Sequence, residues 1–305
     1  MSESNRVVGF IGVGKIGRPM ARRILRTGMR LHVLDIDESA VQELVHEGAI
    51  AAQDIRSLAQ EVDIVITMLP DVPQLRLVAL GPRGLAETMR PGSILIEMST
   101  MDPAMTLEVA GALRRRSVNM LDCPVAKTVE DAKRGELTLM AGGDPAILEA
   151  AKPVLSAMGN VIVHCGELGS GAKAKLINNF IAQGIVCLAS EALTLGVKAG
   201  VSLDVILDVV RNTHAANNQM LFVQDKKSFV GNFGAGFMTR LAAKDQRLIL
   251  KLADDCGVDT PIGRRILADF EETMRAGYAD DDCCSIIRLR EERASVKVRL
   301  DSPGS

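Results

Sequence analysis

Gly9-Phe-Ile-Gly-Val-Gly-Lys-Ile-Gly17 is the stretch that decides the fold. It holds a G-x-G-x-x-G motif at Gly12, Gly14 and Gly17, directly after the apolar run 7–11, which predicts a strand. In such a motif the first glycine permits a tight turn and the second lets the backbone approach a pyrophosphate. The third lets the following helix pack on the strand. Three glycines can also form a simple turn, but a strand before the loop and a helical pattern after it favour a dinucleotide site.

The residues around this loop indicate which dinucleotide it binds. Lys15 and Ile16 lie at the crest of the loop, where a pyrophosphate would sit at the helix N-terminus. Asp35 closes the second apolar run, 18 residues after Gly17. A carboxylate there accepts hydrogen bonds from the ribose 2′-hydroxyl of NAD and repels the 2′-phosphate of NADP. Since no Arg follows Asp35 directly, we expect NAD (NADH) as cofactor, with NADP second; an ordinary helix-capping role for Asp35 is the alternative.

Short apolar runs alternate with helical patterns through the first half of the chain. This alternation predicts βαβ units and a Rossmann-type, doubly wound, mostly parallel α/β sheet covered on both faces. After about residue 168 the strand pattern stops, and a helical pattern runs from about 171 to 199. We therefore expect an NAD-binding domain over 1–167, an all-α C-terminal domain over 168–300 joined through that long helix, and a flexible tail at 301–305. The expected strands are 7–11, 31–34, 62–68, 93–98, 118–123, 137–141 and 161–164, and the expected shorter helices are 16–26, 38–47, 103–115, 145–158, 203–211, 220–227, 237–256, 262–276 and 285–292.

Two further strand ends are expected to line the cofactor site, because ligands of open α/β sheets bind beyond the carboxyl ends of the strands. Leu69 and Pro70 end the strand 62–68, and Thr100 follows the strand 93–98. By position, Leu69 would pack on the cofactor and Thr100 would hydrogen-bond near the nicotinamide ribose. A turn at Leu69-Pro70 and a helix cap at Thr100 are equally good explanations of these residues.

The long helical pattern is apolar almost all round, and its few polar residues recur mainly at spacings of three or four, on one stripe. Lys175, Asn178 and Asn179 form the end of this stripe that falls just after the nucleotide-binding half. Hydride transfer to an aldehyde leaves charge on the carbonyl oxygen, and a protonated Lys can donate to it. Asn179, one turn further, would orient the substrate or the Lys amine. From spacing alone, a Lys that only extends its charged end into solvent is an equal alternative.

The composition argues against several other classes of protein. Net charge is −2 with acids and bases interspersed, and with one Tyr and no Trp nothing favours nucleic-acid binding. The six Cys and four His form no Cys-x-x-Cys pair and no zinc-ligand spacing, so we expect a reduced, cytoplasmic protein without a metal. The polar N-terminus carries no secretory pattern, and no uninterrupted apolar run reaches membrane-spanning length. We therefore expect no membrane partner.

Taken together, the motifs resemble the β-hydroxyacid dehydrogenase family of the 3-hydroxyisobutyrate dehydrogenase type, which has a 6-phosphogluconate dehydrogenase-like C-terminal domain. The resemblance extends over about residues 6–300. It implies that Lys175 is the catalytic acid/base, that Asn179 orients the substrate, and that Lys244 reaches the cofactor. It also implies that the helical domain forms a homodimer or homotetramer. Beyond the glycine loop, the resemblance rests on Pro19-Met-Ala21, Met68-Leu-Pro70, Met98-Ser-Thr100, Asp122-Cys-Pro-Val125, Gly135-Glu-Leu-Thr-Leu-Met-Ala-Gly-Gly143, Gly171-Ala-Lys-Ala-Lys-Leu-Ile-Asn-Asn179 and Lys244-Asp245.

One segment departs from the usual family pattern of Ser-Gly-Gly: here it reads Ala126-Lys127-Thr128. It is similar to the sulfolactaldehyde reductase branch, which carries Gly-Arg-Thr and holds a sulfonate with the Arg. Lys127 keeps the charge but lacks the planar fork of Arg. A second departure, this time from the sulfolactaldehyde reductase branch itself, is Ala182, where that branch has Ser. A solvated loop position for Lys127 and a helix cap at Thr128 are the alternatives.

The resemblance implies reduction of a short anionic aldehyde, with Lys127, Thr128, Asn178 and the 126–128 backbone at the anionic end. We expect 3-sulfolactaldehyde first, then carboxylated semialdehydes such as methylmalonate, succinate or tartronate semialdehyde, as in 3-hydroxyisobutyrate and 4-hydroxybutyrate dehydrogenases. Imine reductases on the same scaffold typically lack a Lys at the position of Lys175, so Lys175 argues against that class. A non-catalytic NAD sensor or assembly protein would need neither Lys175 nor Lys127. Cys123 precedes Pro124, but no His is placed to activate it as a nucleophile.

Overall fold

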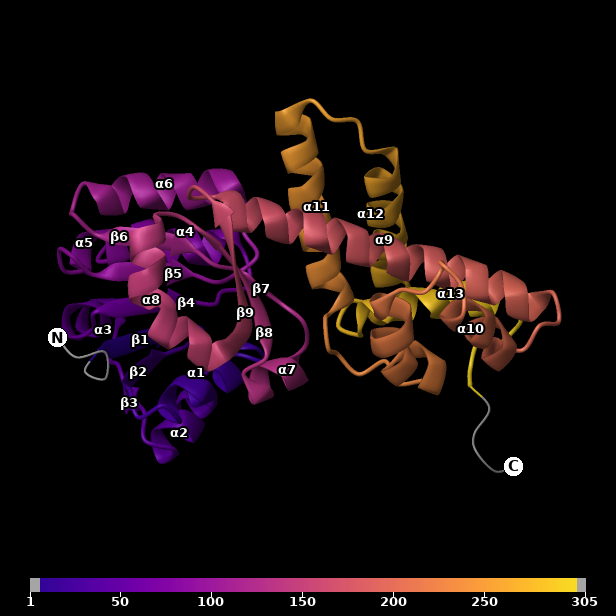
Figure 1. Ribbon diagram of the computed structural model, residues 1–305, viewed down its shortest axis with the longest axis horizontal. Helices are drawn as coiled ribbons and strands as arrows, with labels where there is room; N and C mark the ends of the chain where they lie inside the picture. The colour runs from indigo at the N-terminus through magenta and orange to yellow at the C-terminus, as the bar shows by residue number, and fades with distance from the viewer. Residues whose placement is uncertain (1–5, 301–305) are drawn as a thin grey trace. The chain divides into compact units, whose positions relative to one another are not determined.

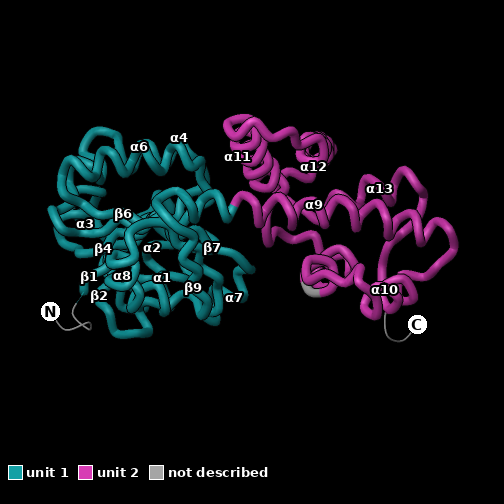
Figure 2. Tube along the Cα trace, turned by 45° about the horizontal axis from the view of Figure 1, so that its top comes forward, with its two compact units in different colours: residues 1–175 teal, residues 176–305 magenta. Residues whose placement is uncertain are grey.

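The computed structural model describes residues 6–300 and divides the chain into two compact units, residues 1–175 and 176–305 (Figure 2). The division falls within the helix α9 (Ser170–Lys198), which begins in unit 1 and continues into unit 2. The domain boundary expected at 167/168 lies in the loop before this helix and stays a prediction. The tail expected at 301–305 lies outside the described residues.

Unit 1 is built on a mostly parallel sheet in the order β3-β2-β1-β4-β5-β6-β8-β7, with β9 paired to β8 (Figure 1). The strands β1 to β6 run parallel, β8 is antiparallel to β6 and β7, and β9 is parallel to β8. This architecture confirms the predicted Rossmann-type fold. The strands are β1 Val7–Ile11, β2 Arg30–Leu34, β3 Ile50–Ala51, β4 Ile64–Thr67, β5 Ile94–Glu97, β6 Asn119–Asp122, β7 Val125–Ala126, β8 Leu137–Gly142 and β9 Gly159–Gly166. The helices are α1 Gly17–Leu25, α2 Glu38–His46, α3 Ile55–Glu61, α4 Val72–Leu80, α5 Leu85–Thr88, α6 Pro103–Arg114, α7 Val129–Arg134 and α8 Pro145–Met158.

The two faces of this sheet carry separate apolar cores. On one face Phe10 and Ile66 pack with side chains of α1, α2 and α8. On the other face Val65 and Leu95 pack with side chains of α3, α4, α5 and α6. Both faces of each central strand are therefore buried, which is why the sequence shows continuous apolar runs here rather than strict alternation.

The sequence pattern missed six elements of unit 1: the strands β3 and β7 and the helices α3, α4, α5 and α7. Two of these helices carry start signals that were present in the sequence. Asp54 and Ser57 form a capping box at α3, and Thr128 and Asp131 form one at α7. Helices of six or seven residues show too few apolar repeats for periodicity to reveal them, so the caps were the only usable signal.

Unit 2 is all-helical over its described residues, apart from an isolated bridge between Met238 and Asp282. Its remaining α-helices are α10 Leu203–Arg211, α11 Thr239–Cys256, α12 Pro261–Thr273 and α13 Ile286–Ala294. The helix expected at 220–227 is wrong: Gln219–Val223 is a π-helical turn, followed by 3₁₀ turns at Gln224–Lys226 and Ser228–Val230. The backbone of Lys227 departs from helical geometry, and this interrupts the segment.

The polar stripe of α9 finds partners inside unit 2. Arg290 of α13 donates to Ser190 of α9 at 2.9 Å and to the buried Asp269 of α12, also at 2.9 Å. Thr194 donates to the carbonyl oxygen of Ser190. By length and average composition α9 could also cross a bilayer, but core helices of water-soluble proteins pass the same test. The partly buried Arg290 connects α9, α12 and α13.

Candidate active site at the carboxyl edge of the sheet

The glycine loop has the shape that a dinucleotide pyrophosphate requires. Gly12 has φ +96°, and a Cβ there would lie 2.2 Å from the carbonyl oxygen of Met68. A Cβ at Gly17 would lie 2.0 Å from the carbonyl oxygen of Gly12, so α1 begins against the strand. A Cβ at Gly14 would meet nothing within 4 Å, which leaves the backbone open to a ligand. These three positions fit the turn, close-packing and approach roles of the fingerprint.

Asp35 follows β2 and has contacts that fix it beside this loop. Its Oδ2 accepts a hydrogen bond from the backbone N–H of Val13 at 2.6 Å, and its Oδ1 accepts from the N–H of Asp37 at 2.9 Å. The N-cap of α2 is Asp37, whose side chain accepts from Ser39 and Ala40. Helix capping is therefore the function of Asp37, and Asp35 remains in position for a ribose.

The strand register brings the other expected cofactor residues to the same edge. Ile11 of β1 pairs with Thr67 of β4, and Thr67 pairs with Glu97 of β5, so the loops after these parallel strands emerge together. The hydroxyl of Ser99 accepts from the backbone N–H of Leu69 at 2.8 Å, while Glu97 accepts from the N–H of Ser99 at 2.9 Å. These bonds join the loop of Leu69 and Pro70 to the loop that carries Thr100.

The start of α9 is attached to this edge through the last residue of β6. Glu97 pairs with Asp122, and the buried Asp122 carboxylate accepts hydrogen bonds from Gly169 and Ala172 at 2.7 Å each. Lys175 lies one turn beyond Ala172, at the end of unit 1, and is half-buried. The structure thus brings Lys175 to the side of the sheet where the glycine loop lies. No role was predicted for Asp122, although a carboxylate in a buried strand must find donors.

The segment 126–128 forms the connection between β7 and α7. Lys127 has φ +84°, in the left-handed region, and its Nζ donates to the carbonyl oxygen of Glu136 at 2.6 Å. The Thr128 side chain caps α7 together with Asp131, so the helix-cap alternative describes what Thr128 does here. Ala126 ends β7 and is half-buried.

In unit 2, one carboxylate holds two of the predicted site residues. The Nδ2 of Asn179 donates to Oδ2 of Asp245 at 2.7 Å, and the Nζ of Lys244 lies 2.9 Å from Oδ1 of Asp245. Asn178 is exposed and donates to the side-chain oxygen of Asn179 at 3.2 Å, and Ala182 on the next turn is half-buried. Asp245 had no predicted role, and its position directly after Lys244 was the signal that could have indicated one.

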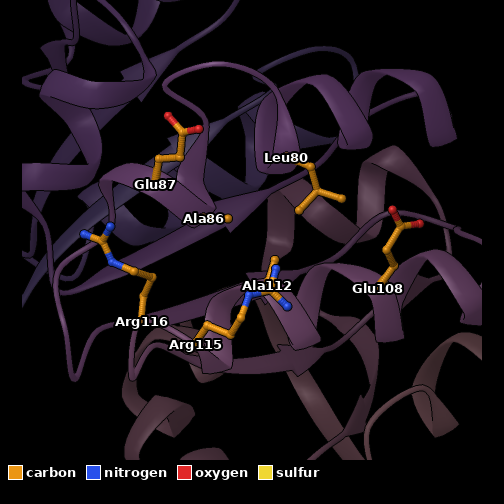
Figure 3. Close-up of a pocket in the computed structure, with 7 residues that line it drawn as sticks. All are labelled: Leu80, Ala86, Glu87, Glu108, Ala112, Arg115 and Arg116. Atoms are coloured by element: carbon orange, nitrogen blue, oxygen red, sulfur yellow. The ribbon is translucent and has the colours of Figure 1, made fainter.

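An open hollow of unit 1 is unrelated to these residues. It has a volume of about 500 Å³ and lies between the ends of α4, α5 and α6, with Glu108 on one side and Arg116 on the other (Figure 3). Because α6 begins after the carboxyl end of β5, its last turn lies at the opposite edge of the sheet. None of the predicted site residues lines this hollow.

A Rossmann-type sheet with this glycine loop, followed by a helical unit, defines an NAD(P)-binding oxidoreductase. The sequence profile of the NAD binding domain of 6-phosphogluconate dehydrogenase matches residues 7–166. A second profile, described as "NAD-binding of NADP-dependent 3-hydroxyisobutyrate dehydrogenase", matches residues 169–290.

Relatives of known function cover almost the whole chain. An NAD-dependent L-serine dehydrogenase of Pseudomonas aeruginosa is 35% identical over 92% of this chain and 97% of its own length. A 3-sulfolactaldehyde reductase of Escherichia coli is 32% identical over 96% of this chain and 98% of its own. The crystal structure of a 3-hydroxyisobutyrate dehydrogenase from Salmonella typhimurium is 31% identical, with a TM-score of 0.82 over 93% of this chain and 100% of that one. The chain belongs to the β-hydroxyacid dehydrogenase family, as its motifs predicted, and it is an enzyme.

Proposed function

We propose that the enzyme reduces a short anionic aldehyde to its hydroxy acid with NADH, reversibly, and that 3-sulfolactaldehyde, giving 2,3-dihydroxypropane-1-sulfonate, is the favoured substrate. The observation that carries this proposal is the attachment of the first turn of α9, just before Lys175, to the carboxyl edge where the cofactor loops gather. A general acid placed beside a dinucleotide loop suits carbonyl reduction.

When bound, NADH would supply the hydride that the carbonyl carbon accepts. The Nζ of Lys175 donates a proton to the carbonyl oxygen as the new C–H bond forms, so the product is an alcohol. In the reverse direction a neutral Lys175 takes the proton from the hydroxyl. Asn179 orients the substrate through its amide, whose Nδ2 is directed to Asp245. Lys127, Thr128, Asn178 and the 126–128 backbone bind the anionic end.

For the cofactor we propose NAD rather than NADP. Asp35 supports this choice because its carboxylate is fixed beside the loop by the N–H groups of Val13 and Asp37. A ribose 2′-hydroxyl can donate to such a carboxylate, whereas a 2′-phosphate would be repelled by it. Lys244, which lies 2.9 Å from Asp245, is proposed to contact the cofactor.

A second class of substrate is favoured by the side chain at position 127. An ammonium group is a point charge without the bidentate fork of Arg, and it therefore holds a carboxylate as readily as a sulfonate. Carboxylated semialdehydes of the 3-hydroxyisobutyrate, 4-hydroxybutyrate and tartronate semialdehyde type belong to this class. The relative named L-serine dehydrogenase also acts on a carboxylated molecule, which supports keeping this class as the alternative.

The test is NADH oxidation with a panel of sulfonated, carboxylated and uncharged aldehydes. We expect the sulfonated aldehyde to give the highest kcat/KM and the uncharged one the lowest. Lys175→Ala should abolish turnover while the Kd for NADH stays unchanged. Lys173→Ala, which removes an exposed Lys from the same helix, serves as the matched control. Turnover that survives nearly unchanged in Lys175→Ala would remove Lys175 from the mechanism.

We also propose a homodimer or homotetramer in the cytoplasm. Four exposed apolar residues on α9 support self-association, at positions 177, 181, 188 and 195. The six free thiols support a reducing compartment. Light scattering of the wild-type protein should give the mass of a dimer or tetramer, and Leu188→Asp should reduce it to the mass of one chain. Val258→Asp, at an exposed residue outside α9, should leave the mass unchanged.

A further inference from the structure

A fully buried carboxylate, that of Asp122, holds the first turn of α9. Its Oδ1 accepts the backbone N–H of Gly169 and its Oδ2 accepts that of Ala172, both at 2.7 Å. The first N–H groups of a helix have no partner within the helix, and they carry the positive end of its dipole. Burial raises the pKa of Asp122, and the backbone hydrogen bonds from α9 oppose this rise. The carboxylate is therefore bound to backbone N–H groups at the start of the helix.

Two glycines allow this helix start to lie directly on the sheet. A Cβ at Gly171 would lie 2.2 Å from the carbonyl oxygen of Met140 in β8 and 2.9 Å from Oδ2 of Asp122. A Cβ at Gly142 would lie 2.5 Å from Oδ1 of Asp122 and 2.8 Å from the backbone nitrogen of Gly171. Since no side chain fits between the helix start and the strands, backbone contact holds the first turn of α9 against the sheet.

We propose that Asp122 is a positioning residue for catalysis, which fixes the first turn of α9 and thereby the place of the Lys175 amine. The inference rests on the proposed function, since it takes Lys175 as the acid/base. Lys175 follows Ala172 by three residues, so the two residues lie on the same face of the helix, one turn apart. A reacting group displaced by about 1 Å can lose about 10²-fold in rate. A small tilt of this turn therefore reduces turnover without changing the residues that bind the ligands.

The first variant is Asp122→Asn, which has nearly the same size. Its amide accepts one of the two N–H groups and turns an NH₂ toward the other. We expect kcat to fall at least tenfold, while the KM for the aldehyde and the Kd for NADH change less than threefold. Amide hydrogen exchange of the segment 168–175 should accelerate at least tenfold. Asp144→Asn is the matched control, because Asp144 caps another helix, α8, by accepting the N–H of Ala146 at 2.7 Å. This variant should change neither kcat nor the hydrogen exchange of 168–175.

A second variant tests the same idea with the carboxylate intact, and also covers the case in which Asp122→Asn does not fold. Gly171→Ala must lift the turn from β8, so we expect the same loss of kcat with little change in KM. Gly184→Ala on the same helix is its control, because the nearest atom to the added Cβ is 3.5 Å away, an ordinary contact. Both variants should leave NADH binding unchanged.

The results separate the inference from the function on which it rests. Wild-type turnover in Asp122→Asn or in Gly171→Ala, with exchange of 168–175 accelerated, would overturn the positioning role. A fall in kcat with exchange unchanged would overturn it too, because the turn would then not have moved. If the wild-type enzyme reduces none of the aldehydes, the proposed function itself is refuted, whereas the exchange measurement still reports whether Asp122 holds the helix.

Discussion

Replacement of Lys127 by Gly should make unit 1 more stable and the enzyme less able to use anionic substrates. Lys127 has φ +84°, and a left-handed backbone costs a residue with a Cβ roughly 1–2 kcal/mol. Gly removes this cost, although it also removes the exposed hydrogen bond from Nζ to Glu136, worth about 0.5 kcal/mol, and loses about 0.5 kcal/mol in unfolded-state entropy. We therefore expect the free energy of unfolding to rise by up to about 1 kcal/mol.

The effect on catalysis follows from the charge. Two unit charges about 4 Å apart interact by about 1 kcal/mol in water and about 4 kcal/mol near a protein surface. Because Lys127 is exposed, we use the lower part of this range, about 1–2 kcal/mol, which corresponds to a loss of about 5–30-fold in kcat/KM for an anionic aldehyde. An uncharged aldehyde should be affected less than threefold.

Urea unfolding and steady-state kinetics with three variants separate the two effects. Lys127→Gly should show both, whereas Lys127→Gln, which keeps the left-handed backbone and removes the charge, should show only the loss of kcat/KM. Lys133→Gln removes an exposed charge from α7 and should show neither. If Lys127→Gln keeps the wild-type kcat/KM for sulfonated and carboxylated aldehydes, Lys127 does not bind the anion. If Lys127→Gly is no more stable than Lys127→Gln, the backbone argument is wrong.

Three further predictions concern the cofactor, pH and the thiols. Asp35→Asn should raise the kcat/KM ratio of NADPH to NADH about tenfold, because the repulsion of the 2′-phosphate is lost; an unchanged ratio of initial rates would contradict the role of Asp35. Burial lowers the pKa of His32 below its ordinary value of 6.5, so the unfolded chain binds more protons and stability should fall as the pH drops below about 6.5. Urea midpoints at pH 5.5 and 7.5 should therefore differ less in His32→Gln than in the wild type, and equal differences would refute this. Iodoacetamide at pH 8 should label the exposed Cys256 first and the half-buried Cys165 more slowly, and mass spectrometry of the native protein measures both rates. Rapid labelling of any buried thiol would contradict the structure. The buried thiols are Cys123, Cys187, Cys283 and Cys284.

The parts of the fold that the sequence predicted are those with strong local signals. The runs that became β1, β4 and β5 are long enough to be buried on both faces, and the glycine motif placed the start of α1. The Asp-Pro pairs at 102–103 and 144–145 marked the first residues of α6 and α8. The π-helical turn at Gln219–Val223 could not be predicted, because its side-chain spacing resembles that of an α-helix.

The candidate site was predictable where a residue acts through its own chemistry. Asp35, Lys175 and Asn179 stay predictions, which rest on residue types and spacings that suit a cofactor or a carbonyl group. Asp122 and Asp245 were missed because each acts on groups far away in sequence: Asp122 binds backbone N–H groups 47 and 50 residues later, and Asp245 binds a side chain 66 residues earlier. A hydrogen bond across such a separation leaves no local pattern.

The partly buried Arg290 has a consequence for the order in which the chain is completed during synthesis. Its partners Ser190 and Asp269 are synthesised 100 and 21 residues before Arg290, which lies in α13, the last helix of the described residues. Because domains fold as they emerge, N-terminal first, unit 1 can form its sheet while unit 2 still lacks the residue that joins α9 to α12. The link from α9 to α12 through Arg290 therefore forms only when nearly the whole chain has been translated.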